Sequence, residues 1–173
     1  MRLRRITRIA FLILVAVLAF SFIAMSGMHP DTVGQVPFKG TVFLVAVPDP
    51  SDTSCAGALR LNISEVGHVT QMGAITAKAF VCQKLDPTDL AFTGQFTYTA
   101  ANGDTVSGTF FGKLAPVSRT LYQLQGEQFT ITGGTGRFVD ASGGGVVTGS
   151  VDLATGEGVH QLDGSISSVG SAN

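Results

Sequence analysis

The chain has 173 residues, of which 45% are hydrophobic and only 13% charged, and its formal net charge is −1. This length fits a single domain. The lack of a basic cluster beyond the first residues argues against a protein that binds nucleic acid or an anionic membrane surface.

The N-terminal segment, residues 1–26, predicts export from the cytoplasm. Four arginines precede an apolar run over residues 9–25, which is typical of a secretory signal peptide. Ala24 and Ser26 offer a cleavage site. The run is also long enough to serve as an uncleaved hydrophobic helix that anchors the chain in a membrane. In both cases the following domain lies outside the cytoplasm, either secreted, periplasmic or anchored facing outward, because the arginines stay inside.

The remainder of the chain divides into a linker, one folded domain and a tail. Residues 27–38 show no hydrophobic period and are expected to form the linker, residues 39–168 the domain, and residues 169–173 the tail. Without residues 1–26 the chain keeps seven Lys and Arg against all 12 Asp and Glu, a net charge of −5.

The domain is predicted to be all-β, since short apolar or Thr-rich runs alternate with turn signals and no segment has a helical period. Eight strands are expected, at residues 39–47, 57–66, 68–83, 91–101, 105–115, 121–132, 145–153 and 157–168. Within the first strand, residues 42–47 are apolar on both faces. Such a strand needs cover on both sides, so its outer face is expected to meet a terminal segment or a second copy of the chain.

Two cysteines, Cys55 and Cys82, both lie in the exported part. An oxidising compartment favours a disulfide between them, with two separate buried thiols as the alternative. No histidine or third cysteine lies at ligand spacing from them, so a metal site is not expected.

A hairpin is predicted over residues 92–112, because Asn102-Gly103 is a preferred two-residue loop of type I′. This loop would set Ala101 opposite Asp104. One face of the hairpin would then collect four aromatic residues and point inward, where they either form plain core or bind a small hydrophobic ligand: Phe92, Phe96, Tyr98 and Phe111.

The glycine-rich stretch over residues 131–145 reads ITGGTGRFVDASGGG. It fits no dinucleotide-binding loop, P-loop or calcium-binding repeat, because the residues that those motifs require are absent. Its glycines therefore predict tight turns and close backbone approaches, with Phe138 pointing inward and Arg137 close enough to Asp140 to pair with it. The residues expected to build this structural loop are Gly133, Gly134, Gly136, Phe138 and Gly143.

Few residues suggest catalysis. No G-x-S-x-G nucleophile motif is present. His160 lies on an apolar strand face, where a hydrogen-bonded core histidine is expected. Glu65 alternates with apolar residues, but a position at the rim is expected because burial of a lone carboxylate is costly. Most of the other acidic residues, a group that includes Glu127, lie at predicted turns or strand ends, where solvated carboxylates are expected.

Three motifs carry a resemblance to a known group of proteins. ITGGTGRFVDASG (131–143) resembles the signature loop of the allene oxide cyclase-like barrel superfamily, which includes dirigent proteins. VGHVTQMG (66–73) and TAANGDTVSGTFFG (99–112) strengthen the resemblance and point to small exported bacterial members. The resemblance covers residues 39–168 and implies an eight-stranded antiparallel barrel, often oligomeric, with a hydrophobic interior that holds small apolar ligands in the plant members.

The resemblance does not carry over a catalytic residue. Ser142 replaces the basic residue common in dirigent proteins, and the tyrosine frequent in the cyclases is missing. Three functions remain open: a binding module for a small hydrophobic molecule, a structural protein that forms oligomers, and, third, a cyclase or isomerase that acts by confinement. No cofactor is expected.

Overall fold

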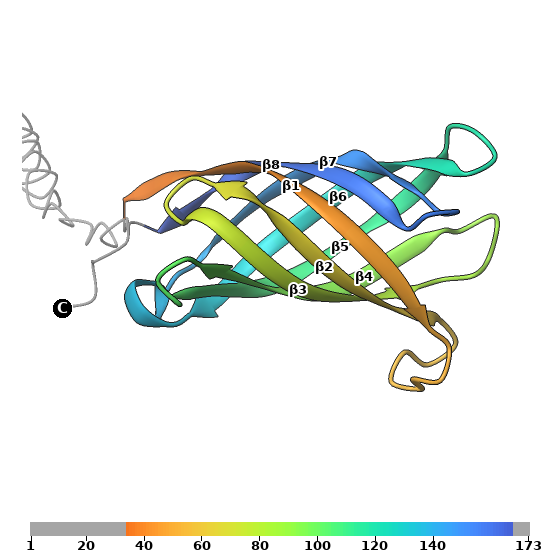
Figure 1. Ribbon diagram of the computed structural model, residues 1–173, viewed down its shortest axis with the longest axis horizontal. Helices are drawn as coiled ribbons and strands as arrows, with labels where there is room; N and C mark the ends of the chain where they lie inside the picture. The colour runs from red at the N-terminus through yellow and green to blue at the C-terminus, as the bar shows by residue number, and fades with distance from the viewer. Residues whose placement is uncertain (1–33, 168–173) are drawn as a thin grey trace, which may run out of the picture. The chain divides into compact units, whose positions relative to one another are not determined.

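The computed structural model describes residues 34–167, which form one closed barrel of eight antiparallel strands (Figure 1). This confirms the predicted all-β barrel. The predicted signal or anchor, residues 27–33 of the linker and the tail lie outside the described residues. The strands are β1 (Gln35–Asp49), β2 (Leu59–Val69), β3 (Gly73–Gln83), β4 (Ala91–Ala100), β5 (Thr105–Pro116), β6 (Leu121–Gly134), β7 (Gly143–Asp152) and β8 (Glu157–Ser167).

Several strand boundaries differ from those predicted by a few residues, and two of these differences affect how the barrel packs. Residues 35–38, assigned above to the linker, begin β1, and Phe38 is fully buried in the core. The predicted break at Gly67 is wrong, because Gly67 lies inside β2 and the turn to β3 is at residues 70–72. A side chain at Gly67 would overlap the carbonyl oxygen of Thr41 on β1. Gly67 therefore permits a close approach of two strands rather than a turn.

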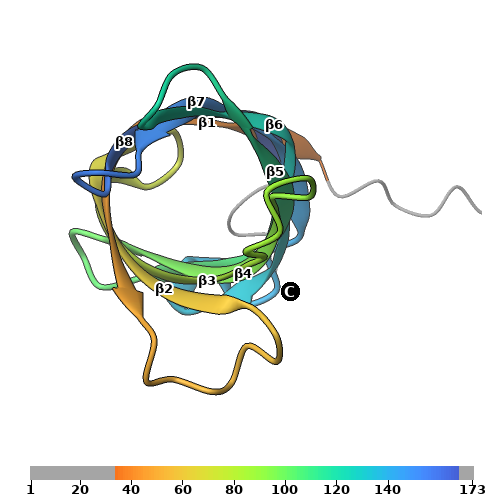
Figure 2. The same cartoon turned by 90° about the vertical axis from the view of Figure 1, so that its right-hand side faces the viewer.

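The barrel interior is filled unequally at its two ends. Each strand pairs with its neighbours in sequence, and β1 pairs with β8 to close the barrel. At the end where β1 begins, a cluster that includes Phe38, Val69, Val106, Phe138 and Ile166 fills the interior. A smaller cluster lies toward the opposite end of the barrel, the end that faces the viewer in Figure 2. It is formed by Leu44, Ile63, Val81, Phe92 and Val151.

The hairpin of β4 and β5 differs from the prediction by one residue. Its loop has three residues, since Ala100 N donates to Asp104 O and Gly103 N donates to Ala100 O. Only Gly103 has a positive φ, at 89°, so the loop is a type I turn with a glycine bulge and not the predicted type I′ turn. Phe96 consequently pairs with Gly108 instead of Thr109. A shift of one residue reverses the two faces of a strand.

The glycine-rich stretch links β6 to β7 and closes the filled end of the barrel. Phe138, in a short 3₁₀ helix (Gly136–Phe138), is buried in the core as predicted. Gly136 has φ of 58°, a conformation that favours glycine. The predicted pairing of Arg137 with Asp140 is wrong: Arg137 Nε lies 3.4 Å from Asp104 Oδ2, and Arg137 Nη2 donates to Gln71 O.

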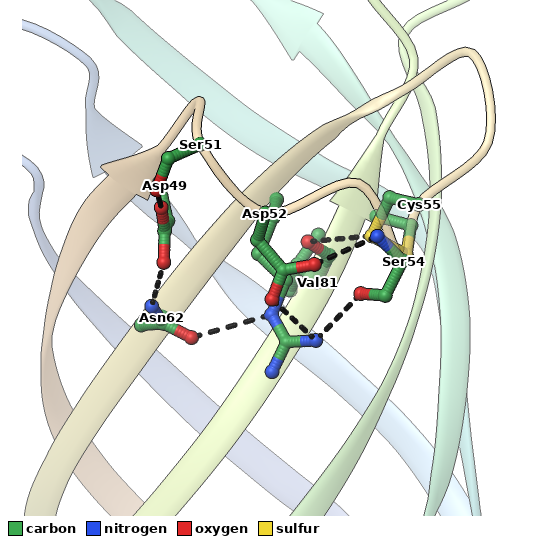
Figure 3. A network of polar contacts seen from close by, with 9 residues as sticks. Asp49, Ser51, Asp52, Ser54, Cys55, Asn62 and Val81 are labelled. Atoms are coloured by element: carbon green, nitrogen blue, oxygen red, sulfur yellow. Dashed lines mark hydrogen bonds and ion pairs between the residues drawn. A yellow bond between two sulfur atoms is a disulfide. The ribbon is translucent and has the colours of Figure 1, made fainter.

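The predicted disulfide is present and joins the β1–β2 loop to β3. Cys55 in the loop is bonded to Cys82 near the end of β3. The same loop is held by Arg60, whose guanidinium lies 2.9 Å from Ser54 Oγ and 3.4 Å from Asp52 Oδ2 (Figure 3). The loop is therefore fixed by one covalent and several polar contacts.

The outer face of β1 is apolar, as predicted. Phe43 is 61% exposed and lies beside Val66 of β2, which is also exposed, and Val45 continues the same face. The cover expected for this face, a terminal segment or a second copy, stays a prediction. Among residues 34–167 there is no helix with the length and apolar character needed to cross a membrane.

Candidate functional site

A cavity of about 290 Å³ lies inside the barrel, with the smaller core cluster in its wall and residues of the larger cluster at its inner end. It opens at the end where β7 turns into β8, because the exposed residues Leu153, Ala154 and Thr155 border it together with Pro48 of β1. Eight-stranded barrels have an interior that side chains fill or that holds one small ligand. In this barrel the filled end is the floor and the open end is the mouth.

Aromatic side chains form much of the cavity wall. Of the four residues predicted to share one face, Phe92, Phe96 and Tyr98 line the cavity. The prediction for Phe111 is wrong, because the one-residue shift in the hairpin turns it outward and leaves it 53% exposed. Phe110 takes its place, and Phe129 of β6 completes the aromatic wall. Ring centroids of neighbouring side chains lie 4.8–6.4 Å apart.

Glu65 of β2 lines the same cavity, beside the aromatic side chains. Its predicted position at the rim is wrong, since the residue is only 7% exposed and lines the cavity. Burial raises the pKa of Glu65 to about 7, and hydrogen bonding by the Tyr98 hydroxyl acts in the opposite direction. Burial and the charge of Glu65 also raise the pKa of Tyr98 well above its usual value. Tyr98 therefore stays a neutral hydroxyl donor.

Glu127 of β6 is a second buried carboxyl in the cavity. The expectation of a solvated side chain is wrong, because Glu127 is 5% exposed. A bulge at Gly126, with φ of 62°, and a register shift between Gln123 and Glu127 reverse the alternation of β6 at this point. Burial first, and the charge of Glu65 second, raise the pKa of Glu127 to about 8. Its alternation with the buried Phe129 is the sequence signal that could have revealed it.

His160 of β8 also lines the cavity. Its Nδ1 lies 3.8 Å from Glu65 Oε1, which is too long for a hydrogen bond. The predicted core position therefore holds, but the predicted hydrogen bond is absent. Burial lowers the pKa of His160 to about 4, so the imidazole is neutral at pH 7.

These groups give the cavity a defined chemistry at neutral pH. Glu127 is mostly protonated, Glu65 is divided between its two forms, and His160 and Tyr98 are neutral. Carboxyl groups with raised pKa values in an apolar site can donate or accept a proton near neutrality. Within residues 34–167, no group of three or more His, Cys, Asp or Glu side chains is arranged to hold a metal ion.

Comparison with known proteins identifies the fold. No protein-family model and no curated protein matches the sequence. Among solved structures, the barrel is similar to the pterocarpan synthase dirigent protein PsPTS1, with 15% identity and a TM-score of 0.54 over 79% of this chain and 96% of that one. It is also similar to the pterocarpan synthase dirigent protein GePTS1, with 17% identity and a TM-score of 0.55 over 81% and 88%. The predicted dirigent-like barrel is thereby confirmed as a fold.

Proposed function

We propose that this chain is an exported protein that binds one small, mainly apolar molecule inside its barrel. The observation that carries the proposal is the cavity of about 290 Å³, which is open at one end and walled largely by apolar side chains, five of them aromatic. Ligand sites in proteins are concave, mostly apolar and supplied with a few polar groups. The volume is at the low end of the usual range for such sites, so the ligand is small.

Uptake of a neutral apolar fluorophore, N-phenyl-1-naphthylamine, tests this proposal. Ala79 of β3 lines the cavity, whereas Ala74 of the same strand is exposed. The variant A79F should fill the cavity and abolish the fluorescence rise, and the matched variant A74F should keep it. A79L is the milder change if A79F proves unstable. No uptake by the parent protein, or equal uptake by folded A79F, would contradict the proposal.

Export is supported by the basic and apolar start of the sequence and by the disulfide between Cys55 and Cys82, since such bonds persist in oxidising compartments. Mass spectrometry of the protein recovered from its native cells tests this part. A chain that lacks residues 1–26 supports a cleaved signal, and a full-length chain in the membrane fraction supports the anchor. A full-length chain in the cytoplasm contradicts export.

A second candidate function, acid–base catalysis on the bound molecule, is favoured by one observation. Glu65, Tyr98, Glu127 and His160 all reach the same cavity, and the pKa values of both carboxyls are raised to near neutrality. Groups with this environment cluster at catalytic sites. A cyclase or isomerase that confines its substrate would need such a proton donor and acceptor. The similar structures are named as pterocarpan synthases, which supports catalysis as a use of this fold.

A model proton-transfer reaction tests the second candidate. In 5-nitrobenzisoxazole a base removes the ring C–H proton, and the N–O bond breaks to give a phenolate. Ionised Glu65 should act as this base, so the rate should rise as pH passes through about 7. E65Q should lose the rate increase, and E157Q, a change at an exposed glutamate, should keep it. No acceleration by the parent protein would reject this candidate.

A further inference from the structure

Two carboxyl oxygens in the cavity have no partner. Glu65 Oε2 and Glu127 Oε2 are both buried, and neither makes a hydrogen bond. The two residues come from β2 and β6, which are separated by three strands on each side of the closed barrel. Two facing walls therefore each contribute an unpartnered polar atom to one cavity. Because buried polar groups in proteins are nearly always hydrogen-bonded, this arrangement indicates a ligand that supplies the missing contacts.

The charges of the side chains that line the cavity indicate which ligand group would bind the two free oxygens. Among the described residues that line the cavity there is no Lys or Arg. The one basic side chain among these lining residues is His160, which burial keeps neutral by lowering its pKa to about 4. Tyr98, from β4, is neutral as well. Within residues 34–167, the cavity thus gathers two acidic groups from opposite walls and no positive counterpart.

The aromatic wall favours the same kind of group. Phe96 and Tyr98 pack with ring centroids 4.8 Å apart, and Phe92, Phe110 and Phe129 lie around them. The face of an aromatic ring attracts a cation within about 6 Å of its centre, and aromatic cages recognise organic ammonium groups in this way. Carboxylates and ring faces together offer both contacts that an ammonium group needs, while the aliphatic residues receive an apolar body.

We infer that the ligand of this cavity is a small apolar molecule that carries one protonated amine. This inference depends on the binding function proposed above and adds the charge of the ligand to it. The ammonium group lies between Glu65 and Glu127 and donates its N–H hydrogens to their free oxygens, and the apolar part lies against the rings. A neutral alcohol would offer a single donor and no charge, and an organic acid would be repelled.

Proton release accompanies this binding. In the free protein Glu127 is mostly protonated at pH 7, because its pKa is raised to about 8, and Glu65 is partly protonated. A bound ammonium ion stabilises the ionised carboxylates and so lowers both pKa values. Each carboxyl that ionises gives its proton to solvent. Binding of an amine at pH 7 should therefore release up to about one proton from Glu127 and about half a proton from Glu65.

Competition against N-phenyl-1-naphthylamine tests the inference with three matched probes, namely 2-phenylethylamine, 2-phenylethanol and phenylacetate. At pH 8 the amine should bind at least tenfold more tightly than the alcohol, and phenylacetate should bind most weakly. The preference for the amine should disappear in the double variant E65Q/E127Q and persist in E157Q, which carries the same change at an exposed glutamate. Calorimetry of the parent protein in two buffers of different ionisation enthalpy should show proton release with the amine and none with the alcohol.

The outcomes separate this inference from the binding function itself. Failure of the fluorophore to enter the parent protein overturns both. If the fluorophore enters but the amine fails to displace it, or binds no better than the alcohol, only the inference about charge is overturned. A preference for the amine that survives in folded E65Q/E127Q overturns it as well, because the positive group would then be recognised elsewhere.

Discussion

Glu65 and His160 meet across β1, with Glu65 Oε1 3.8 Å from His160 Nδ1. The two residues lie on β2 and β8, the two strands that pair with β1. The pKa of Glu65 is raised to about 7 and that of His160 lowered to about 4. Glu65 is therefore charged mainly above pH 7 and His160 mainly below pH 4. No pH exists at which both are largely ionised, and the contact is not an ion pair.

Stability should fall as pH rises from about 4.5 to about 8, because the pKa values of both cavity carboxyls are raised on folding. For Glu127 the pKa rises from 4.5 to about 8, so between these values the folded state holds more protons than the unfolded state, and each increase in pH favours unfolding. E127Q removes this titration. It should be more stable than the parent protein by at most about 4 kcal/mol at pH 8 and show a much smaller difference at pH 5. Urea unfolding at the two pH values measures the difference, and a gain independent of pH would contradict the assignment.

The titration of His160 should change the unfolding free energy in the opposite direction at acidic pH. Its pKa is lowered from 6.5 to about 4, so the unfolded state binds a proton between these values that the folded state does not. Stability due to His160 is therefore lost as pH falls from about 6.5 to about 4. Because the two carboxyl titrations act in the opposite direction over the same range, the variant H160Q should show an unfolding free energy that falls more steeply as pH rises. An unchanged pH dependence in H160Q, measured by the same urea titrations, would contradict this role of His160.

Removal of the disulfide should destabilise the barrel. The bond joins residues 27 positions apart, and closure of a loop of this size restricts the unfolded chain by about 3–4 kcal/mol. The double variant C55A/C82A should lose about this much unfolding free energy in denaturant titrations. Reductant should destabilise the parent protein by a similar amount and leave the double variant unaffected. An equal response of both proteins to reductant would rule out the bond as the cause.

The two adjacent phenylalanines of β5 should behave differently. Phe110 is partly buried and packs against both core clusters, whereas Phe111 is 53% exposed. F110A should cost roughly 2–3 kcal/mol, somewhat less than the 3–5 typical of fully buried aromatic residues, and F111A less than about 1. Thermal and urea unfolding of the two variants measure this. A larger loss of stability in F111A than in F110A would instead support the hairpin register predicted from sequence.

Phe138 should be essential to the closed end of the barrel. It is almost fully buried, while the next residue, Val139, is 55% exposed. F138A should lose about 3–5 kcal/mol of unfolding free energy by leaving a cavity in the core. V139A is the matched control and should change stability by less than about 1 kcal/mol. Similar losses in both variants would mean that Phe138 does not anchor the connection between β6 and β7.

Much of the fold follows from local pattern in the sequence. Strand lengths, turn residues and alternation predict all eight strands, and the resemblance of the glycine-rich stretch predicts the closed barrel. The prediction from sequence is wrong where one residue more or less in a loop decides which face of a strand is buried. Asn102-Gly103 is compatible with a two-residue or a three-residue loop, and the choice decides whether Phe110 or Phe111 faces inward. Local propensity does not distinguish these loops, because their energies depend on how the paired strands pack.

The order of residues along the chain is enough to predict eight alternating strands, a basic and apolar start, and a glycine-rich connection with one inward phenylalanine. It does not predict which polar residues share the cavity, because these meet only in the closed barrel. Glu65 and Glu127 are 62 residues apart in sequence, and a bulge at Gly126 turns the second of them inward. Alternation specifies two faces of a strand but not which one is buried. That choice is made by register, bulges and barrel closure, which depend on contacts between distant strands.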